Sequence, residues 1–265
     1  MKDIQIAIIG AGIGGMTAAV TLAQKGFKVK VFEQAPELSE VGAGLTVTPN
    51  ATKGLIYLGL GEAMNKIGMA HDLQGVRHYQ TKEIIVPLKR GKHMLEKYGA
   101  YQFQVHRADI HDILIESLEK HSPGCVSIDH QLVGIDQKSD RVKLIFNNQA
   151  EYECDFVIGA DGTRSAVRKS ILGNDEPEFS GYVAWRGVVP TDGLDESDFD
   201  ECGSCAFISP GRVFARYLIR DAKEYNYVAF LATDEWAEEG WSIPSKVETV
   251  LETFSDYNQQ VKNII

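Results

Sequence analysis

The first 33 residues follow the order strand, glycine turn, helix, strand, acid. The apolar run from Ile4 to Ile9 is typical of a strand buried on both faces. It leads into the glycine-rich stretch 10–15, which is followed by an Ala- and Leu-rich segment of helical length, Met16–Lys25, with Gly26 as its C-terminal cap. A second strand-like run, Lys28–Phe32, then ends at Glu33. This order predicts a βαβ unit that binds a dinucleotide.

Each element of the pattern has a physical role. Gly10 permits the tight turn, Gly12 lets the backbone approach a pyrophosphate, and Gly15 allows the helix to pack closely on the strand. The start of the helix offers free N–H groups and the positive end of its dipole to phosphates. Glu33 follows the last glycine of the turn, Gly15, at about the spacing typical of an acid that accepts hydrogen bonds from both ribose hydroxyls. Its negative charge would repel a 2′-phosphate at this position. The fingerprint does not by itself distinguish FAD from NAD.

A second glycine-rich stretch follows at residues 40–50 and contains Gly42 and Gly44. The segment Ala51–Leu58 after it is expected to be a helix, with Asn50 as its N-cap. A nicotinamide dehydrogenase needs no glycine loop at this point, so the stretch favours FAD. Taken alone, it is equally well an ordinary loop.

Two further signals come later in the chain. His106-Arg107 precedes a predicted helix, Asp109–Lys120, so Arg107 could reach a phosphate or ribityl group, or serve as a surface ion-pair partner. The strand-like run Phe156–Ile158 leads into Asp161-Gly162, and a helix that carries Ser165 and Arg168 is expected to follow. Ligands collect where strands end in α/β sheets, so Asp161 is a candidate for a ribose or ribityl hydroxyl. Alone, Asp-Gly is only a turn signal.

The remaining strand signals are short alternating runs. Residues 75–88 are expected to form a hairpin. Further strands are expected at 127–128, 142–146, 182–189, 206–209, 212–219 and 225–233.

Composition narrows the classes of partner. The formal net charge is −10, which makes nucleic acid and anionic membrane surfaces poor candidates. No apolar run reaches the roughly 18 residues of a membrane span, and no signal peptide is evident, so a cytoplasmic protein with unpaired cysteines is expected.

No metal site is expected. Cys202 and Cys205 have C-x-x-C spacing but no second pair of ligands nearby. The acidic stretch 192–201 lacks calcium-loop spacing and is expected to be a solvated loop. Trp236 and Trp241 are expected to be packing residues.

Together these motifs resemble those of the FAD-dependent aromatic hydroxylases, which are single-component flavoprotein monooxygenases of the p-hydroxybenzoate hydroxylase fold. The most similar branch contains the salicylate, 3-hydroxybenzoate and 6-hydroxynicotinate hydroxylases. The matching segments, which span nearly the whole chain, are Gly10–Gly15, Gly42–Gly44 before Pro49-Asn50, His106-Arg107, Gly159–Arg168 and Tyr182–Gly187.

The resemblance implies an α/β fold in which a Rossmann-like FAD-binding domain is interleaved with a β-sheet substrate domain. The FAD-binding domain would comprise residues 1–74 and 104–176, and the substrate domain residues 75–103 and 177–265.

The resemblance also assigns cofactor contacts. The pyrophosphate would lie against Gly10, Gly12, Ile13, Gly14 and Gly15, with Asp161 and Gly162 beside it. Glu33 would hold the adenosine ribose and Leu132 would reach the adenine. Gly44, Leu45 and Thr46 would lie along the isoalloxazine ring, and Arg107 would contact the ribityl–phosphate region.

The implied reaction uses NADH or NADPH to reduce FAD. The reduced flavin takes up O2 as a C4a-hydroperoxide, which hydroxylates a small phenolic or carboxylated aromatic. The resemblance leaves open the ring, the choice of NADH or NADPH, and whether the protein is a homodimer.

Tyr217 and Arg216 are the candidate catalytic residues. Tyr217 and Asn226 match a recurrent Tyr…Asn spacing in this branch, in which the Tyr lines the substrate pocket. We expect Tyr217 to hydrogen-bond the substrate, and the alternative is a core tyrosine. Leu218 stands where a Pro is common, and Arg212 and Val213 stand where relatives often carry a His, so no base is assigned.

One family segment has no counterpart. Members of the family carry a later Gly-Asp-Ala-x-His-Pro segment that binds the riboflavin half of FAD, and this sequence has none. The expectation is a fold incomplete at its C-terminus, with weak FAD binding and apolar surface exposed near Phe32, Ile158 and Val167. The alternatives are a flavin-binding remnant without turnover, or an enzyme of the same fold with other chemistry. The Trp-x-Trp-x-Ile motif of the flavin halogenases is absent.

Overall fold

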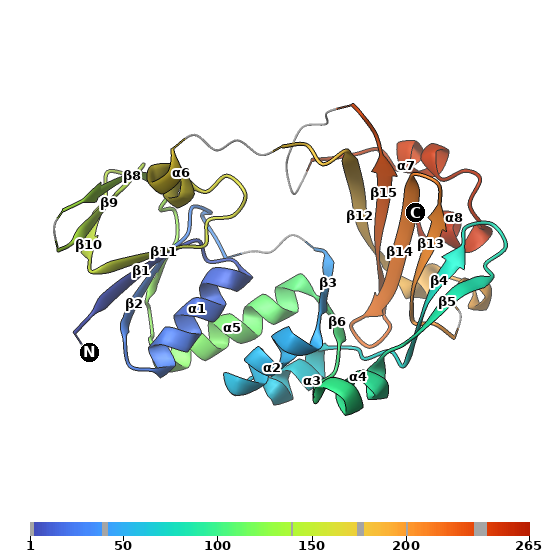
Figure 1. Ribbon diagram of the computed structural model, residues 1–265, viewed down its shortest axis with the longest axis horizontal. Helices are drawn as coiled ribbons and strands as arrows, with labels where there is room; N and C mark the ends of the chain where they lie inside the picture. The colour runs from blue at the N-terminus through green and yellow to red at the C-terminus, as the bar shows by residue number, and fades with distance from the viewer. Residues whose placement is uncertain (1–2, 39–41, 139, 174–177, 200, 236–242) are drawn as a thin grey trace. The chain divides into compact units, whose positions relative to one another are not determined.

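The chain passes back and forth between two structural units. The computed structural model describes residues 3–38, 42–138, 140–173, 178–199, 201–235 and 243–265 (Figure 1). The first unit comprises Met1–Glu40 and Ile110–Glu178, and the second comprises Val41–Asp109 and Phe179–Ile265. Residues 41–74 therefore belong to the same unit as the expected substrate sheet. The assignment of cofactor and substrate to separate domains stays a prediction, and the packing expected of Trp236 and Trp241 lies outside the described residues.

The first unit is built on a parallel sheet of order β11-β1-β2-β7. Its strands are β1 (Gln5–Ile9), β2 (Lys28–Phe32), β7 (Val126–Ser127) and β11 (Phe156–Gly159). Its helices are α1 (Ile13–Gln24), α6 (Ala166–Leu172) and most of α5 (Arg107–His121). Ile6 to Ile9 are all buried, which confirms the strand buried on both faces.

A second, antiparallel sheet completes the core of this unit. Its order is β10-β9-β8, formed by β8 (Leu132–Gln137), β9 (Val142–Phe146) and β10 (Glu151–Cys154). Phe32 packs against Phe146, with ring centroids 4.6 Å apart. The expectation of exposed apolar surface is wrong for Phe32 and Val167, which are 3% and 6% exposed, because β8 and β9 cover them. The exposed apolar side chains of this unit include Phe156, Ile171 and Leu172.

The second unit contains a six-stranded sheet of order β12-β15-β14-β13-β4-β5 and a two-stranded ribbon, β3-β6. The strands are β3 (Gly44–Val47), β4 (Leu73–His78), β5 (Ile84–Lys89), β6 (Phe103–His106), β12 (Tyr182–Pro190), β13 (Ser204–Ser209), β14 (Arg212–Ile219) and β15 (Glu224–Ala232). The helices are α2 (Pro49–Tyr57), α3 (Gly61–Ile67), α4 (Gly91–Tyr98), α7 (Val247–Thr253) and α8 (Gln259–Ile264), with 3₁₀ turns at Thr191–Gly193 and Glu196–Asp198. The expected hairpin and the later strands are confirmed.

The two faces of the six-stranded sheet differ in character. One face carries an aromatic core that α7 and α8 cover (Figure 1), and it contains Phe207, Phe214, Tyr225, Tyr227, Phe254 and Tyr257. Successive residues of a strand point to opposite faces, so Tyr217 and Asn226 lie on the other face. Cys202 and Cys205 are buried in the aromatic core, where Arg77 Nη2 donates to Cys202 Sγ at 3.5 Å.

Several expected boundaries were wrong for local reasons. Helix α1 begins at Ile13, so Gly14 and Gly15 lie inside it. Thr48 is the N-cap of α2 in place of Asn50, because Pro49 takes the first helical position, which suits its fixed φ.

Asp198, in the acidic stretch 192–201, is not solvated as expected: it is buried and accepts a hydrogen bond from Asn263 Nδ2 at 2.8 Å. No helix among the described residues is long and apolar enough to cross a membrane.

The turn between β14 and β15 has an unusual backbone. Arg220, Asp221 and Ala222 have φ of +50°, +56° and +61°, a left-handed conformation that costs about 1–2 kcal/mol for each non-glycine residue. Thr191 Oγ1 donates to the Ala222 carbonyl at 2.8 Å, and Thr191 N–H donates to the Lys223 carbonyl at 2.9 Å. Contacts made by the turn therefore offset its backbone strain.

We predict that Ala222→Gly stabilises the protein by about 1 kcal/mol, because glycine adopts positive φ without the Cβ penalty. Urea unfolding monitored by circular dichroism measures the change. The matched control is Ala229→Gly, in the buried part of β15, which is expected to destabilise the protein. Equal destabilisation by both substitutions would show that the turn is not strained.

Candidate functional site

The glycine turn after β1 contains two tightly packed glycines and two open ones. Gly10 has φ +98°, and a Cβ there would collide with the carbonyl of Ala160. A Cβ at Gly15 would collide with the carbonyl of Gly10, whereas Cβ atoms at Gly12 and Gly14 would meet nothing within 4 Å. Gly10 and Gly15 are thus required by the fold itself. Gly12 and Gly14 leave the backbone open to a ligand.

Helix α1 begins at this turn without a side-chain cap. Gly12 is its N-cap residue, and within the described residues no side-chain cap hydrogen bond is made at this helix start. Ile13 is the first residue of the helix. Unpaired N–H groups at the positive end of a 12-residue helix suit a phosphate. The turn therefore fits the pyrophosphate of a dinucleotide.

Glu33 follows β2 and holds the glycine turn in place. Its Oε2 accepts a hydrogen bond from Ala11 N–H at 2.7 Å, and its Oε1 accepts one from Ala35 N–H at 3.0 Å. An ionised carboxylate can accept about four hydrogen bonds, so Glu33 keeps capacity for ribose hydroxyls. Leu132 lies in the core beside Phe32, and His130 N–H donates to the Glu33 carbonyl at 2.8 Å. The two residues expected on the adenosine side are therefore placed close together.

The Asp161 loop lies directly against the glycine turn. Ala160 N–H donates to the carbonyl of Ile9 at 2.7 Å. The carboxylate of Asp161 accepts hydrogen bonds from Ser165 Oγ at 2.5 Å and Val167 N–H at 3.1 Å, so it organises the start of α6. Gly162 has φ +76°, and a Cβ there would meet nothing within 4 Å. The first unit therefore brings the Gly10 and Asp161 motifs together.

His111 also contributes to this site, although it was not predicted from the sequence. It lies on α5, is 3% exposed, and its Nε2 is 2.5 Å from the carbonyl oxygen of Ala11 in the glycine turn. The helical spacing of His111 with Leu114 and Leu118, which are also buried, was the available signal.

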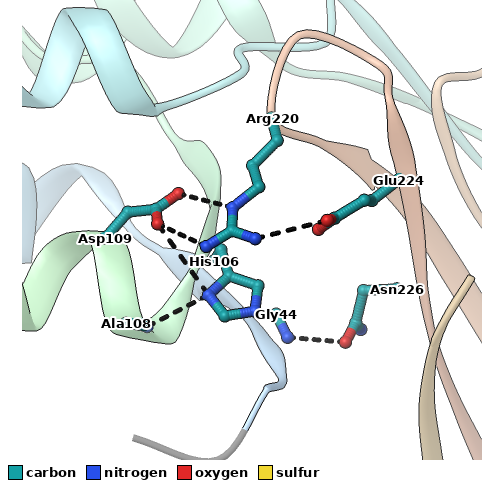
Figure 2. A network of polar contacts seen from close by, with 7 residues as sticks. All are labelled: Gly44, His106, Ala108, Asp109, Arg220, Glu224 and Asn226. Carbon is teal, nitrogen blue, oxygen red and sulfur yellow. Dashed lines mark hydrogen bonds and ion pairs between the residues drawn. The ribbon is translucent and has the colours of Figure 1, made fainter. Parts of the chain in front are cut away.

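In the second unit, β3 lies against the six-stranded sheet at Gly44. Gly44 N–H donates to Asn226 Oδ1 at 2.6 Å (Figure 2). A Cβ at Gly44 would stand 2.7 Å from both Asn226 and Tyr217, so only glycine allows this approach. Leu45 and Thr46 continue β3, which pairs with β6. The segment expected along the isoalloxazine ring is thus attached to the strands that carry the expected substrate residues.

Arg107 is the first residue of α5, directly after β6, as expected for a strand-to-helix junction. Its backbone N–H donates to the carbonyl of Ala43 at 2.8 Å. Two residues later, Asp109 accepts two hydrogen bonds from Arg220, from Nε at 3.0 Å and from Nη2 at 2.7 Å (Figure 2). Arg220 also contacts Glu224 at 3.2 Å, and its bond to Asp109 raises the pKa of Arg220. This network connects the start of α5 to the strained β14–β15 turn.

Tyr217 lies beside Asn226 in the β14–β15 register and faces Gly44. Burial raises the pKa of Tyr217 to about 12, although Arg186 and the Asn226 side chain act in the opposite direction. The phenol is therefore neutral at physiological pH. It can serve as a hydrogen-bond donor or acceptor, and it does not act as a resting base.

The side chains of Arg216 and Tyr217 do not lie on the same face of the sheet. The Arg216 side chain is fully buried on the opposite face of the sheet, where Nη1 donates to Tyr225 Oη at 2.6 Å. Its guanidinium lies 4.8 Å from the centroid of the Tyr225 ring. These contacts place Arg216 in the aromatic core, so the structure gives its expected catalytic role no geometric support. Among the described residues, no three His, Cys, Asp or Glu side chains are placed to hold a metal ion.

Comparisons with known proteins agree with this geometry. The family model described as "FAD binding domain" matches residues 3–254. A 6-hydroxynicotinate 3-monooxygenase of Pseudomonas fluorescens is 34% identical over 98% of this chain and 67% of its own length. A 3-hydroxybenzoate 6-hydroxylase of Aquipseudomonas alcaligenes is 31% identical over 98% of this chain and 66% of its own length.

Solved structures show the same fold. Klebsiella pneumoniae HpxO, crystallised with FAD and uric acid, has a TM-score of 0.83 at 24% identity and covers 98% of this chain and 64% of its own. A salicylate hydroxylase in complex with its substrate has a TM-score of 0.75 at 23% identity and covers 99% of this chain and 66% of its own.

The chain belongs to the FAD-binding family of aromatic hydroxylases, as the family model and these relatives show. It spans about two thirds of the length of the curated relatives it matches. FAD is the cofactor of this family, and the glycine turn, the start of α1 and Glu33 fit it.

We predict that Gly12→Ala lowers FAD affinity by about tenfold or more, about 1.4 kcal/mol, while the fold is unchanged, because the added methyl meets only ligand. Gly15→Ala is the contrast: its methyl collides with backbone, so the protein itself should be destabilised. FAD titration followed by fluorescence, with thermal unfolding of the apoprotein, measures both. A Gly12→Ala protein with wild-type FAD affinity would refute the pyrophosphate assignment.

We predict that Tyr217 stays protonated to about pH 11, because burial raises its pKa from 10.0 to about 12. The raised pKa contributes stability below about pH 10, which is lost as the pH rises toward about 12. Ultraviolet titration of the wild type and of Tyr217→Phe should therefore coincide up to about pH 11. An extra tyrosine in the wild type that is half ionised at about pH 10 would contradict the burial of the phenol.

Proposed function

We propose that this protein is an NAD(P)H- and FAD-dependent monooxygenase that uses O2 to hydroxylate a small aromatic compound. The activities for which its relatives are named support this class of reaction, since they include hydroxylation of 6-hydroxynicotinate and 3-hydroxybenzoate. Phenols and pyridones with a carboxylate are accordingly the first substrates to test.

The observation that carries the proposal is the junction of Gly44, Asn226 and Tyr217. The hydrogen bond of 2.6 Å from Gly44 to Asn226 holds the expected flavin segment against the sheet face that carries Tyr217. A ring bound on this face would lie beside both the flavin segment and a neutral phenol. Closeness of the reacting groups is what a transfer of oxygen from flavin to ring requires.

The residues of this face have separate tasks. FAD, when bound, supplies the redox chemistry and the activation of O2. Tyr217 would hydrogen-bond a ring substituent and hold the ring in one orientation. Arg186, which acts on Tyr217 electrostatically, would favour the anionic form of a bound phenol or carboxylate. The aromatic core behind β14 gives Tyr217 a rigid base.

Three finer expectations accompany this proposal. O2 would be the co-substrate, and dependence on NAD(P)H favours a cytoplasmic location. Homodimer formation stays a prediction from the family resemblance.

Activity is tested by the oxidation of NADH and NADPH with and without 6-hydroxynicotinate and 3-hydroxybenzoate. The proposal predicts that the aromatic compound stimulates the oxidation of NADH or NADPH, and that the product carries one added oxygen atom. Tyr217→Phe is expected to lower kcat/KM by about 10²-fold, the usual loss for an orienting or acid–base group. Ile85→Val, on the exposed edge strand β5, is a control expected to have no effect.

Two results would contradict the proposal. Bound FAD without NAD(P)H oxidation in the presence of any phenol or pyridone would favour a flavin-binding protein without turnover. Unchanged kinetics of Tyr217→Phe would remove Tyr217 from the substrate site.

A further inference from the structure

The turn between β14 and β15 contains three consecutive non-glycine residues with positive φ, Arg220, Asp221 and Ala222. The other such residues in the described part of the chain stand singly, and they are Lys82, Asp129 and Gln149. A left-handed conformation is unfavourable for a residue with a Cβ, so a run of three persists only where surrounding contacts hold it. Such strain is concentrated at functional sites, which makes the side chains of this turn candidates for a functional role.

The turn directs the Arg220 side chain between two carboxylates (Figure 2). Nε and Nη2 of Arg220 donate to the two oxygens of Asp109 at 3.0 and 2.7 Å, and Nη1 donates to Glu224 Oε1 at 3.2 Å. A fork that donates two parallel hydrogen bonds fixes the orientation of a carboxylate as well as its distance. The Arg220 side chain is 38% exposed, and partly exposed ion pairs contribute little to stability. Geometry is therefore the larger part of what this contact supplies.

Asp109 lies in the first turn of α5, close to the residues that hold the segment at the start of β3. Its Oδ1 is 4.0 Å from Nδ1 of His106, the residue that pairs with Gly44 in the β3–β6 ribbon. Arg107 N–H donates to the carbonyl of Ala43 at 2.8 Å. Asp109 is thus within three residues of both backbone contacts to this segment.

The same segment is also bound by β15. Gly44 N–H donates to Asn226 Oδ1 at 2.6 Å, and Asn226 follows Glu224 by two residues on this strand. Residues i and i+2 of a strand point to one face, so the carboxylate that braces Arg220 and the amide that binds Gly44 share the face that carries Tyr217. A segment bound at one point can turn about that point, whereas two attachments to a single hairpin fix its orientation.

We propose that Arg220 is a positioning residue for the flavin: through Asp109 it holds Arg107 and the segment 43–44 in the orientation in which they contact FAD. The inference rests on the proposed function, in which this segment lies along the flavin, and it deepens that function by naming the residue that sets the segment. Arg220 acts through Asp109 and makes no proposed contact with FAD or substrate. Lysine would keep the charge and lose the fork, so it is not an equivalent residue here.

FAD titration followed by flavin fluorescence tests the positioning role. Arg220→Gln removes the fork, so the affinity for FAD should fall by about tenfold, the lower end of the losses that follow removal of a residue that orients metal ligands. The visible circular dichroism of the bound flavin should change as well, because the ring would lose its fixed neighbour. Arg220→Lys should recover only part of the affinity and remain about threefold below the wild type.

The matched control is Arg212→Gln. Arg212 lies at the other end of β14 and forms a comparable bidentate pair with Asp256, at 2.8 and 2.9 Å. Its partners Thr253, Asp256 and Tyr257 lie at the end of α7 and just after it. Arg212→Gln should therefore change the melting temperature of the apoprotein about as much as Arg220→Gln does, and it should leave FAD affinity and the flavin spectrum unchanged.

Two results would overturn the positioning role. One is wild-type FAD affinity and an unchanged flavin spectrum in Arg220→Gln. The other is an equal loss of FAD affinity in Arg212→Gln, because the effect would then come from general destabilisation. If Arg220→Gln does not fold, Arg220→Lys decides the question: wild-type affinity overturns the role, and a loss of about threefold supports it.

NADH oxidation by the same preparations separates this inference from the proposed function. If an aromatic compound stimulates NADH oxidation by the wild type while FAD binding is unchanged in Arg220→Gln, the proposed function stands and the positioning role is overturned. Weaker FAD binding in Arg220→Gln, together with a wild type that never hydroxylates a ring, would support the positioning role and count against the proposed function. A wild type that does not bind FAD would overturn both.

Discussion

The second unit depends on the close approach of β3 to the six-stranded sheet at Gly44. The hydrogen bond from Gly44 N–H to Asn226 Oδ1 is 2.6 Å long, and a side chain at residue 44 would collide with Asn226 and Tyr217. Because Asn226 is fully buried, this bond is shielded from competing water. It places a backbone segment suited to a flat cofactor against a face suited to a small ring. Strand β6 and the Arg220–Asp109 network are arranged around this junction.

The first unit applies the same principle to phosphate. Gly10 and Gly15 let strand, turn and helix pack without intervening side chains, so the start of α1 is held rigidly. Glu33 and His111 then fix the turn through Ala11, by its N–H and its carbonyl respectively. Preorganised N–H groups bind an anion without a cost of reordering, so residues that hold the fold of this turn are also suited to the proposed cofactor contacts.

Local signals made much of the fold predictable from the sequence. The βαβ unit, the hairpin at 75–88 and strands β9 and β14 were found because each has a strong period and clear breakers. The short strands β8 and β10 were missed, because β8 contains a glycine and a register shift and β10 is only four residues long. The sequence could also propose Arg216 and Tyr217 together, although strand alternation places them on opposite faces.

The central claim is that this fold brings FAD and a small aromatic ring together so that oxygen passes from O2 to the ring. Isotope tracing tests it most directly: purified protein is supplied with FAD, NADH, 6-hydroxynicotinate and O2 labelled with a heavy oxygen isotope, and the product is analysed by mass spectrometry. The account predicts one labelled oxygen atom in each hydroxylated ring, with none from water. Unlabelled product, or NADH oxidation that never yields a hydroxylated ring from any phenol or pyridone, would contradict it.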